Sequence, residues 1–188
     1  MFELPKSEFW DFSLSVYKQP EVSGACLQLQ DEHGANINMM LFACWLGNTG
    51  RGVVDIDEWR AMIRRTTHWR DKVIRPLRSV RRFLRDEQLA PLSMKDNILK
   101  SEFDAEHIEQ LILEKEWGMA RAGQTKEALL CLQDIADNLY NYFAADDIEL
   151  DEGLGRCCEG LIGLITGNRD SQVLHQASRQ ALTGRDNR

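Results

Sequence analysis

Arginine is concentrated in one stretch of this chain, where its spacing suggests recognition of oxyanions. Between Trp59 and Arg85 there are ten cations, nine of them arginine, against the single anion Asp71, a local balance of +9. Planar guanidinium groups donate paired hydrogen bonds to carboxylates and phosphates, which a lysine ammonium cannot do. The residues whose spacing puts them on one helical face are Arg75, Arg78, Arg82 and Arg85. Together with Arg64 and Trp69, they form the candidate partner-binding site.

Acidic residues dominate a later stretch, so the arginines have two possible uses. From Asp96 to Glu152, fifteen acidic residues face four basic ones. The basic helices therefore either contact an acidic protein or RNA, or form internal ion pairs with these acidic helices. The overall charge of -7 opposes nucleic acid, because a net acidic molecule repels a polyanion, and no known nucleic-acid motif accompanies the arginines. Trp69 is a candidate for base stacking or for a helix junction.

Histidine, cysteine and glycine do not combine into a recognised catalytic or metal motif. A di-iron helical bundle needs Glu-x-x-His on two helices, and only Asp104-x-x-His107 comes near. The five cysteines have irregular spacing, with no Cys-x-x-Cys pair and no zinc-type cluster with histidine. The glycines of residues 47–52 lack the Gly-Lys-Ser/Thr ending of a phosphate loop. We expect reduced thiols, no metal and no cofactor, and a protein that is not an enzyme.

A second candidate site is a pocket between helices. Its proposed lining residues are Trp10, Asn38, Trp45 and Glu106. Asn38 follows the start of an apolar helix, where an amide is also explained as a capping group. Phe9, Trp10 and Phe12 span a wider arc than one inward stripe needs, so one of them is free to close a groove or a homodimer contact, although a larger core also explains them. This pocket is the basis for an alternative function as a small-molecule binder or an enzyme.

The elements that position these residues are helices. Apolar residues recur every three or four positions along most of the chain, and strand-like alternation never persists. We predict an all-α fold, a compact multi-helix bundle of about seven to eight helices. The expected segments are 7–17, 20–33, 36–46, a basic stretch from 55 to 85 kinked or restarted at Pro76, 96–122, 125–143 and 151–165. Segment 36–46 is apolar nearly all round, so it must lie in the middle of the fold.

The chain has the usual length of one domain. We expect a single helical domain over residues 1–167 and a polar carboxyl-terminal tail over 168–188, in which a short helix can form before a frayed end. The longest apolar run, Met39–Leu46, is much shorter than a bilayer crossing needs, and the amino terminus has no signal-peptide pattern. The expected location is the cytoplasm, with no membrane contact.

A series of short motifs marks the amino-terminal part of the chain. They are Phe9-Trp10-Asp11-Phe12-Ser13-Leu14, Tyr17, Pro20, Val22, Ala25-Cys26-Leu27-Gln28-Leu29-Gln30-Asp31, Asn36-Ile37-Asn38 and Trp45-Leu46, continued by Glu102-Phe103-Asp104-Ala105-Glu106 and Glu109-Gln110-Leu111. In this combination the chain resembles a small uncharacterised bacterial family, labelled only as a domain of unknown function, over residues 7–150. The resemblance implies no activity and assigns no functional residue.

The leading hypothesis is a non-enzymatic helical interaction protein whose arginine-rich helix pair binds an acidic protein or RNA. The alternatives are a small-molecule binder or enzyme with an inter-helix pocket, and a nucleic-acid-binding protein.

Overall fold

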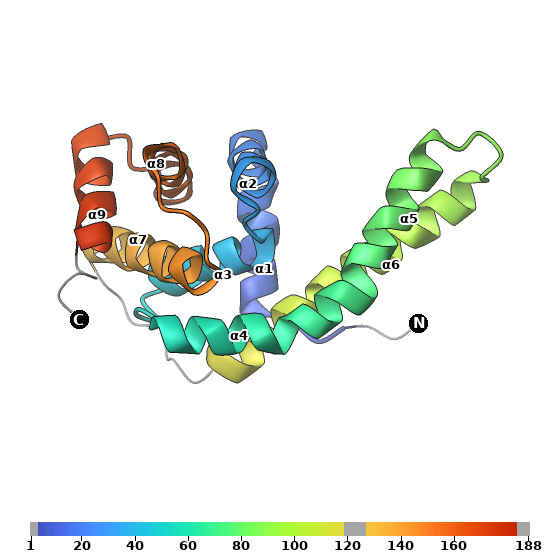
Figure 1. Cartoon of the computed structure of the whole chain (residues 1–188), viewed down its shortest axis with the longest axis horizontal. Coiled ribbons are helices and arrows are strands. Elements are labelled where there is room, and N and C mark those ends of the chain that lie inside the picture. The colour runs from blue at the N-terminus through green and yellow to red at the C-terminus, as the bar shows by residue number, and fades with distance from the viewer. Residues whose placement is uncertain (1–3, 119–126, 184–188) are drawn as a thin grey trace.

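The chain folds as a bundle of helices. A computed structural model describes residues 4–118 and 127–183, and within these ranges no residue lies in a β-strand, which confirms the all-α prediction. The helices are α1 (Glu8–Tyr17), α2 (Pro20–His33), α3 (Ile37–Asn48), α4 (Ile56–Trp69), the π-helical turn η1 (Arg70–Ile74), α5 (Arg75–Asp86), α6 (Leu92–Leu113), the π-helical turn η2 (Glu114–Gly118), α7 (Ala128–Ala145), α8 (Glu152–Thr166) and α9 (Ser171–Thr183). Figure 1 shows their arrangement.

Helix α3 is the centre of the fold, as its uniform apolarity predicted. Every residue from Met39 to Gly47 is buried, and α1, α2, α6, α7 and α8 all pack around the helix. Its start is stabilised by Asn36, whose Oδ1 accepts a hydrogen bond from the backbone N–H of Met39 at 3.1 Å. Gly47 allows the close crossing of α3 and α7, because a Cβ there would lie 2.4 Å from the backbone nitrogen of Ile135.

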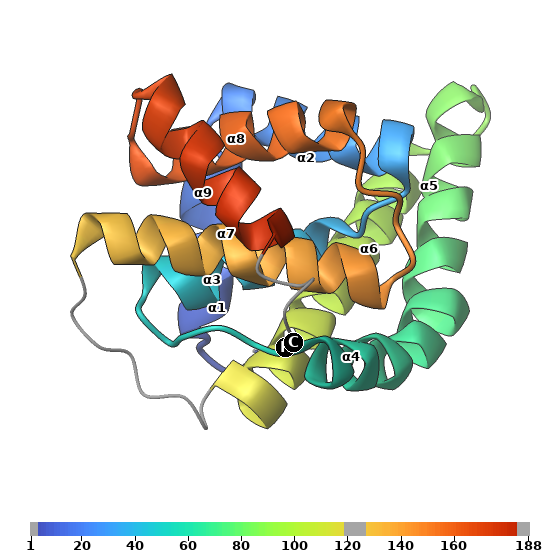
Figure 2. The same ribbon diagram turned by 60° about the vertical axis from the view of Figure 1, so that its left-hand side comes forward.

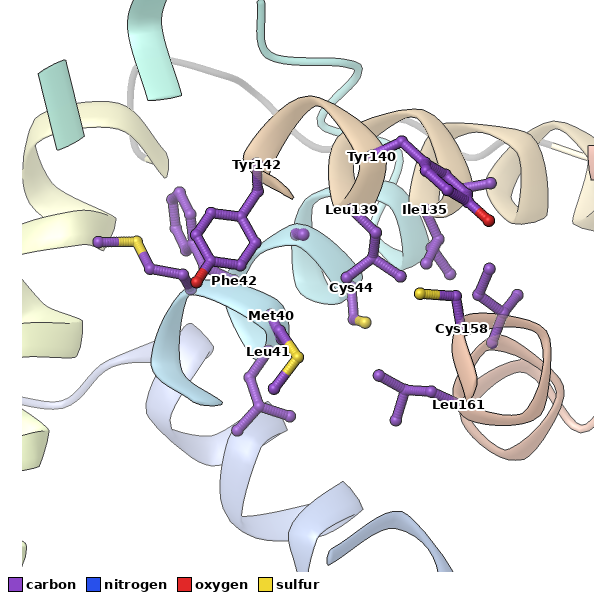
Figure 3. Close-up of a cluster of buried hydrophobic side chains, with 14 of the residues drawn as sticks. Met40, Leu41, Phe42, Cys44, Ile135, Leu139, Tyr140, Tyr142, Cys158 and Leu161 are labelled. Carbon is purple, nitrogen blue, oxygen red and sulfur yellow. The ribbon is translucent and has the colours of Figure 1, made fainter. Parts of the chain in front are cut away.

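The apolar core lies between α3, α7 and α8. Side chains of all three helices point toward one another in Figure 3, with Cys44 and Cys158 facing across the cluster and Leu139 and Leu161 beside them. Phe42 extends this core toward α1, where its ring meets that of Phe9 at 5.0 Å between centroids. All five cysteines are free thiols, as the irregular spacing suggested. The core therefore depends on apolar packing and not on covalent cross-links.

The basic segment is a helical path with one interruption. Asp55 caps α4 by accepting a hydrogen bond from Glu58 N at 2.8 Å, and the path then runs through η1 into α5. Pro76 lies in the first turn of α5, where its missing N–H is tolerated. The wider π-helical turn immediately before it marks the interruption that the proline predicted.

Helices α5 and α6 form a hairpin that runs away from the rest of the bundle (Figure 1). Helix α6 begins at Leu92, directly after Pro91, and so starts one turn earlier than the predicted segment 96–122. Proline suits the position before a helix because a backbone N–H there would have no intrahelical partner, so the N–H that proline lacks is not missed. The hairpin also carries large apolar side chains that are exposed: Val80, Phe83, Leu89, Leu92, Met94, Leu99 and Phe103.

The carboxyl-terminal helices close the other side of the core. Helix α9 lies in the carboxyl-terminal stretch, and Figure 2 shows it lying across α7. Its buried Leu174, Ala177 and Ala181 join the main apolar cluster. The predicted end of segment 96–122 and the predicted start of segment 125–143 lie outside the described residues, as does the predicted frayed end over 183–188 apart from Thr183. Within the described ranges, each helix falls short of the length or apolarity that a bilayer crossing demands.

Candidate functional site

A groove separates the α5–α6 hairpin from the corner formed by α1, α2 and α3. Its cavity has a volume of about 770 Å³. On the hairpin side, α5 is rich in arginine and α6 contributes both glutamates and the apolar Leu99 and Phe103, while the opposite wall carries apolar and amide side chains. The charged lining residues are Arg70, Arg75, Arg78, Arg81, Arg82, Glu102, Glu106 and Glu109, while Trp10, Leu14, Tyr17, Leu27, Gln30, Asn36 and Asn38 line the opposite side. An occupant of this groove therefore meets two chemically different surfaces.

The glutamates of α6 pair with some of the arginines of α5. Arg78 donates to Glu102 at 3.1 Å and to Glu106 at 2.6 Å, and Arg81 donates to Glu102 at 2.5 Å. The Glu102 side chain is only 7% exposed, so these pairs are partly shielded from water. A buried carboxylate needs such partners, because an unpaired charge away from water is costly. These arginines therefore form internal ion pairs with the acidic helix α6, which is one of the two uses that the sequence allowed.

Other arginines of the segment remain accessible. Arg75 pairs with Asp71 at 2.7 Å, and Arg85 pairs with its neighbour Asp86 at 3.3 Å, but both side chains are at least 66% exposed. Arg82 is exposed on the groove wall and has no ion pair within the part of the chain that the structure describes. Exposed local pairs contribute little to stability, so these guanidinium groups can exchange their partners for those of a ligand.

A hydrogen-bonded network forms the floor of the groove. Glu109, with a side chain 1% exposed, accepts from Asn38 Nδ2 at 2.6 Å and from Arg70 Nε at 3.2 Å. Gln110 Nε2 donates to Asn38 Oδ1 at 2.8 Å. The network ties α3, η1 and α6 together, which makes the base of the hairpin rigid.

Two polar atoms at the groove are buried without a hydrogen-bond partner in the described structure. They are the Oγ atom of Ser13 and the Oε1 atom of Gln110, and both residues line the groove. Ser13 is 3% exposed and Gln110 is 2% exposed. An orphaned buried acceptor or hydroxyl is costly, so these atoms are candidate contacts for a bound group.

Three of the five tryptophans have different positions. Trp10 lines the groove, stacks on His107 with ring centroids 4.2 Å apart and meets Phe103 edge-on at 4.8 Å. Trp69 donates from Nε1 to the carbonyl of Ala105 at 2.9 Å, so it joins the end of α4 to α6 as a helix-junction residue. Trp45 is 1% exposed and belongs to the core. Of the pocket residues suggested by the sequence, the structure brings Trp10, Asn38 and Glu106 to one groove and leaves Trp45 behind it.

Burial dominates the electrostatics of the groove. It raises the pKa of the Glu106 carboxyl, and the hydrogen bond and charge of Arg78 counteract that rise. Burial also raises the pKa of the Tyr17 hydroxyl, and the nearby Cys26 and Glu106 add to the effect. A carboxyl with a raised pKa is a frequent feature of functional sites, but structural ion-pair networks also produce it.

The arginines predicted as one set are divided by the fold. Arg75, Arg78 and Arg82 line the groove, whereas Arg64 lies exposed on α4 away from it and Arg85 follows toward the hairpin tip. The sequence did not predict Glu102 and Glu109 as site residues, although both belong to the motifs of the family resemblance; in the structure they organise the wall and floor. Their spacing with Glu106, at four and then three residues, was the available signal, because it places all three carboxylates on one face of a helix.

The chain also matches the model of a known family. A family model described as "Protein of unknown function (DUF2390)" matches residues 8–113, which include α1 to α6 and so both walls of the groove. No curated protein and no solved structure matches the chain.

Proposed function

For this chain, which belongs to the family of proteins of unknown function DUF2390, we propose a non-enzymatic role as a helical interaction protein. It binds an acidic, amphipathic helical segment of a partner protein in the groove between the α1–α2–α3 corner and the α5–α6 hairpin. The observation that carries this proposal is the lining of the groove, because arginines line the α5 side, while apolar side chains line the α1–α2–α3 corner and α6 contributes Leu99 and Phe103. A helix in such a groove presents acids to one wall and apolar residues to the other.

Exposed apolar side chains at the groove favour a protein partner over RNA. Leu27 on α2 and Leu99 and Phe103 on α6 are 44%, 54% and 46% exposed, and all three line the groove. Apolar anchors spaced by three or four residues on a partner helix would cover them. Phosphate backbones offer no such apolar contact.

The arrangement of charges also favours a protein partner over RNA. In the basic segment, Arg64, Lys72 and Arg82 have no ion pair within the described residues, while the groove also carries three glutamates. A polyanion would need many free cations, and it would be repelled by the glutamates. A partner helix with a few well-placed carboxylates needs only Arg82 and the exposed Arg75.

Selection from a display library of helical peptides against the intact protein tests the proposal. The expected winners carry Asp or Glu on one face and apolar residues at positions i, i+3 or i+4, and i+7 on the other. Arg82→Glu combined with Arg75→Glu should weaken the selected peptide by about tenfold or more in fluorescence anisotropy, since two charge-assisted contacts are reversed. Arg60→Glu is the matched control, because this exposed α4 arginine lies outside the groove.

The same assay distinguishes the alternatives. Selected peptides without acidic residues, or an equal loss of peptide affinity in the Arg60→Glu control, would contradict the proposal. An RNA oligonucleotide that binds more tightly than the peptides, with affinity falling steeply as salt rises, would favour the nucleic-acid hypothesis.

A small polar ligand at the groove floor is the second candidate. The unpaired Ser13 Oγ and Gln110 Oε1 support it, because each lacks a hydrogen-bond partner in the described structure and both residues line the groove. A thermal-shift screen of small polar compounds would identify such a ligand. Ser13→Ala should then reduce the rise in melting temperature that the ligand causes, while Arg82→Glu should leave that rise unchanged.

A further inference from the structure

Away from the groove, three potential metal ligands meet between α2 and α8. Glu32 and His33 end α2, and Cys157 lies in α8, which packs against α2 (Figure 2). One ligand atom from each of these three residues lies within 4.8 Å of the other two. We propose that Glu32, His33 and Cys157 form a binding site for a divalent transition-metal ion, with Zn²⁺ as the best fit.

The donor set has the chemistry of a zinc site. Thiolate, imidazole and carboxylate are the three side-chain ligands that Zn²⁺ uses, at about 2.0 to 2.3 Å. Donors on one tetrahedral ion then lie roughly 3.5 Å apart, so small rotamer changes bring these atoms into range. With Cys157 ionised and His33 neutral, the two negative charges of the site balance a divalent cation.

Each ligand is placed for binding. The Nε2 atom of His33 is buried and has no hydrogen-bond partner in the described structure, which leaves it free to coordinate an ion. Glu32 is held by Gln28 of the preceding turn, whose Nε2 lies 3.2 Å from both carboxylate oxygens. Such outer contacts orient metal-binding carboxylates.

The surroundings leave room for a fourth ligand. A cavity of about 410 Å³ adjoins the site and is lined by both Glu32 and Cys157. Gly153 and Gly160 of α8 also line it, so no side chain from those positions fills the space. Three protein ligands with an accessible fourth position are typical of zinc sites that bind water or a substrate group.

Cys157 and its neighbour Cys158 have different environments. Cys158 is fully buried and points into the core cluster, where burial raises the pKa of its thiol (Figure 3). Cys157 is partly exposed at the α2–α8 contact. Because α2 and α8 are far apart in the sequence, a metal ion held by all three ligands would link the amino-terminal helices to the carboxyl-terminal ones.

Titration of the chelator-treated, full-length protein with Co²⁺ and then Zn²⁺ tests the site. We expect one equivalent of Co²⁺ to bind with a thiolate-to-cobalt charge-transfer band, which Zn²⁺ should abolish by displacement. Cys157→Ser should remove the band and weaken Zn²⁺ binding by about tenfold or more in calorimetry, because it removes the thiolate ligand. Zn²⁺ should raise the melting temperature of the unmodified protein but not of this variant.

Cys131→Ser on α7 is the matched control, because Cys131 is also a partly exposed free thiol but lies outside the cluster. It should keep the band, the stoichiometry and the thermal shift. His33→Ala gives a second test that leaves the thiol in place, and circular dichroism of each metal-free variant checks its folding. No charge-transfer band, or Zn²⁺ affinity unchanged in both Cys157→Ser and His33→Ala, would overturn the proposal.

Discussion

The α3–α7 pair in the core and the α5–α6 hairpin at the edge are held together by different interactions. In the first pair, buried apolar residues meet directly, and Gly47 brings the helices into close contact. In the hairpin, arginines of α5 pair with Glu102 and Glu106 of α6, and large apolar side chains remain exposed. Because its apolar contacts depend on one another, the α3–α7 pair opens only when the whole core unfolds. The hairpin is stabilised by fewer, directional contacts, so its helices can open locally. We therefore expect the core around α3 and α7 to be rigid and the α5–α6 hairpin to open or move independently of it.

Truncating one phenylalanine in each region tests this contrast most strongly. Phe42→Ala should lower the free energy of unfolding by about 3–5 kcal/mol, because it leaves a cavity among fully buried rings. Phe83→Ala on α5 should change it by less than about 0.5 kcal/mol, because that side chain is 69% exposed. Chemical denaturation of both variants measures the difference, and similar losses in the two would contradict it.

Removing a carboxylate from the hairpin should have an intermediate, local effect. Glu102→Ala leaves Arg78 and Arg81 without their shared partner, and we expect a loss of about 1–3 kcal/mol. Hydrogen exchange should locate the change in α5 and α6, with protection in α3 and α7 retained. Glu116→Ala is the control, because within the described residues it breaks the more exposed pair with Arg65 and should cost less than about 1 kcal/mol. Loss of protection throughout the molecule would instead mean that hairpin and core open together.

The smallest expected effect is a pH dependence at His107 of α6, where the hairpin meets α1 through the stacking of His107 on Trp10. Burial lowers the pKa of His107 below 6.5, although Asp104, Asp11 and Glu114 counteract the shift. Folding therefore disfavours the charged imidazole, so this contribution to stability is present above pH 6.5 and is lost as the pH falls toward the lower folded-state value. His107→Phe keeps an aromatic ring against Trp10 and should reduce the fall in melting temperature between about pH 7 and pH 5. An equal fall in melting temperature in both proteins would refute the assignment of this pH dependence to His107.

The local features of this protein follow directly from its sequence. Apolar residues at helical spacing predicted the helices, the uniform apolarity of segment 36–46 predicted its central position, and Pro76 predicted the interruption in the basic segment. These features depend on neighbouring residues, whose backbone and burial preferences act over one or two helical turns. The arginine cluster was visible for the same reason.

Which arginines pair and which remain accessible was decided by tertiary structure. Arg78 and Arg82 share one predicted face, yet α6 supplies glutamates to Arg78, while Arg82 remains exposed on the groove wall. The sequence also placed Trp45 with Trp10 in one pocket, but the packing of α1 against α3 buries Trp45 in the core. The cluster of Glu32, His33 and Cys157 likewise has no sequence signature. In each case, side chains distant in the sequence meet only because the helices pack, and periodicity within one helix carries no information about the register of the next.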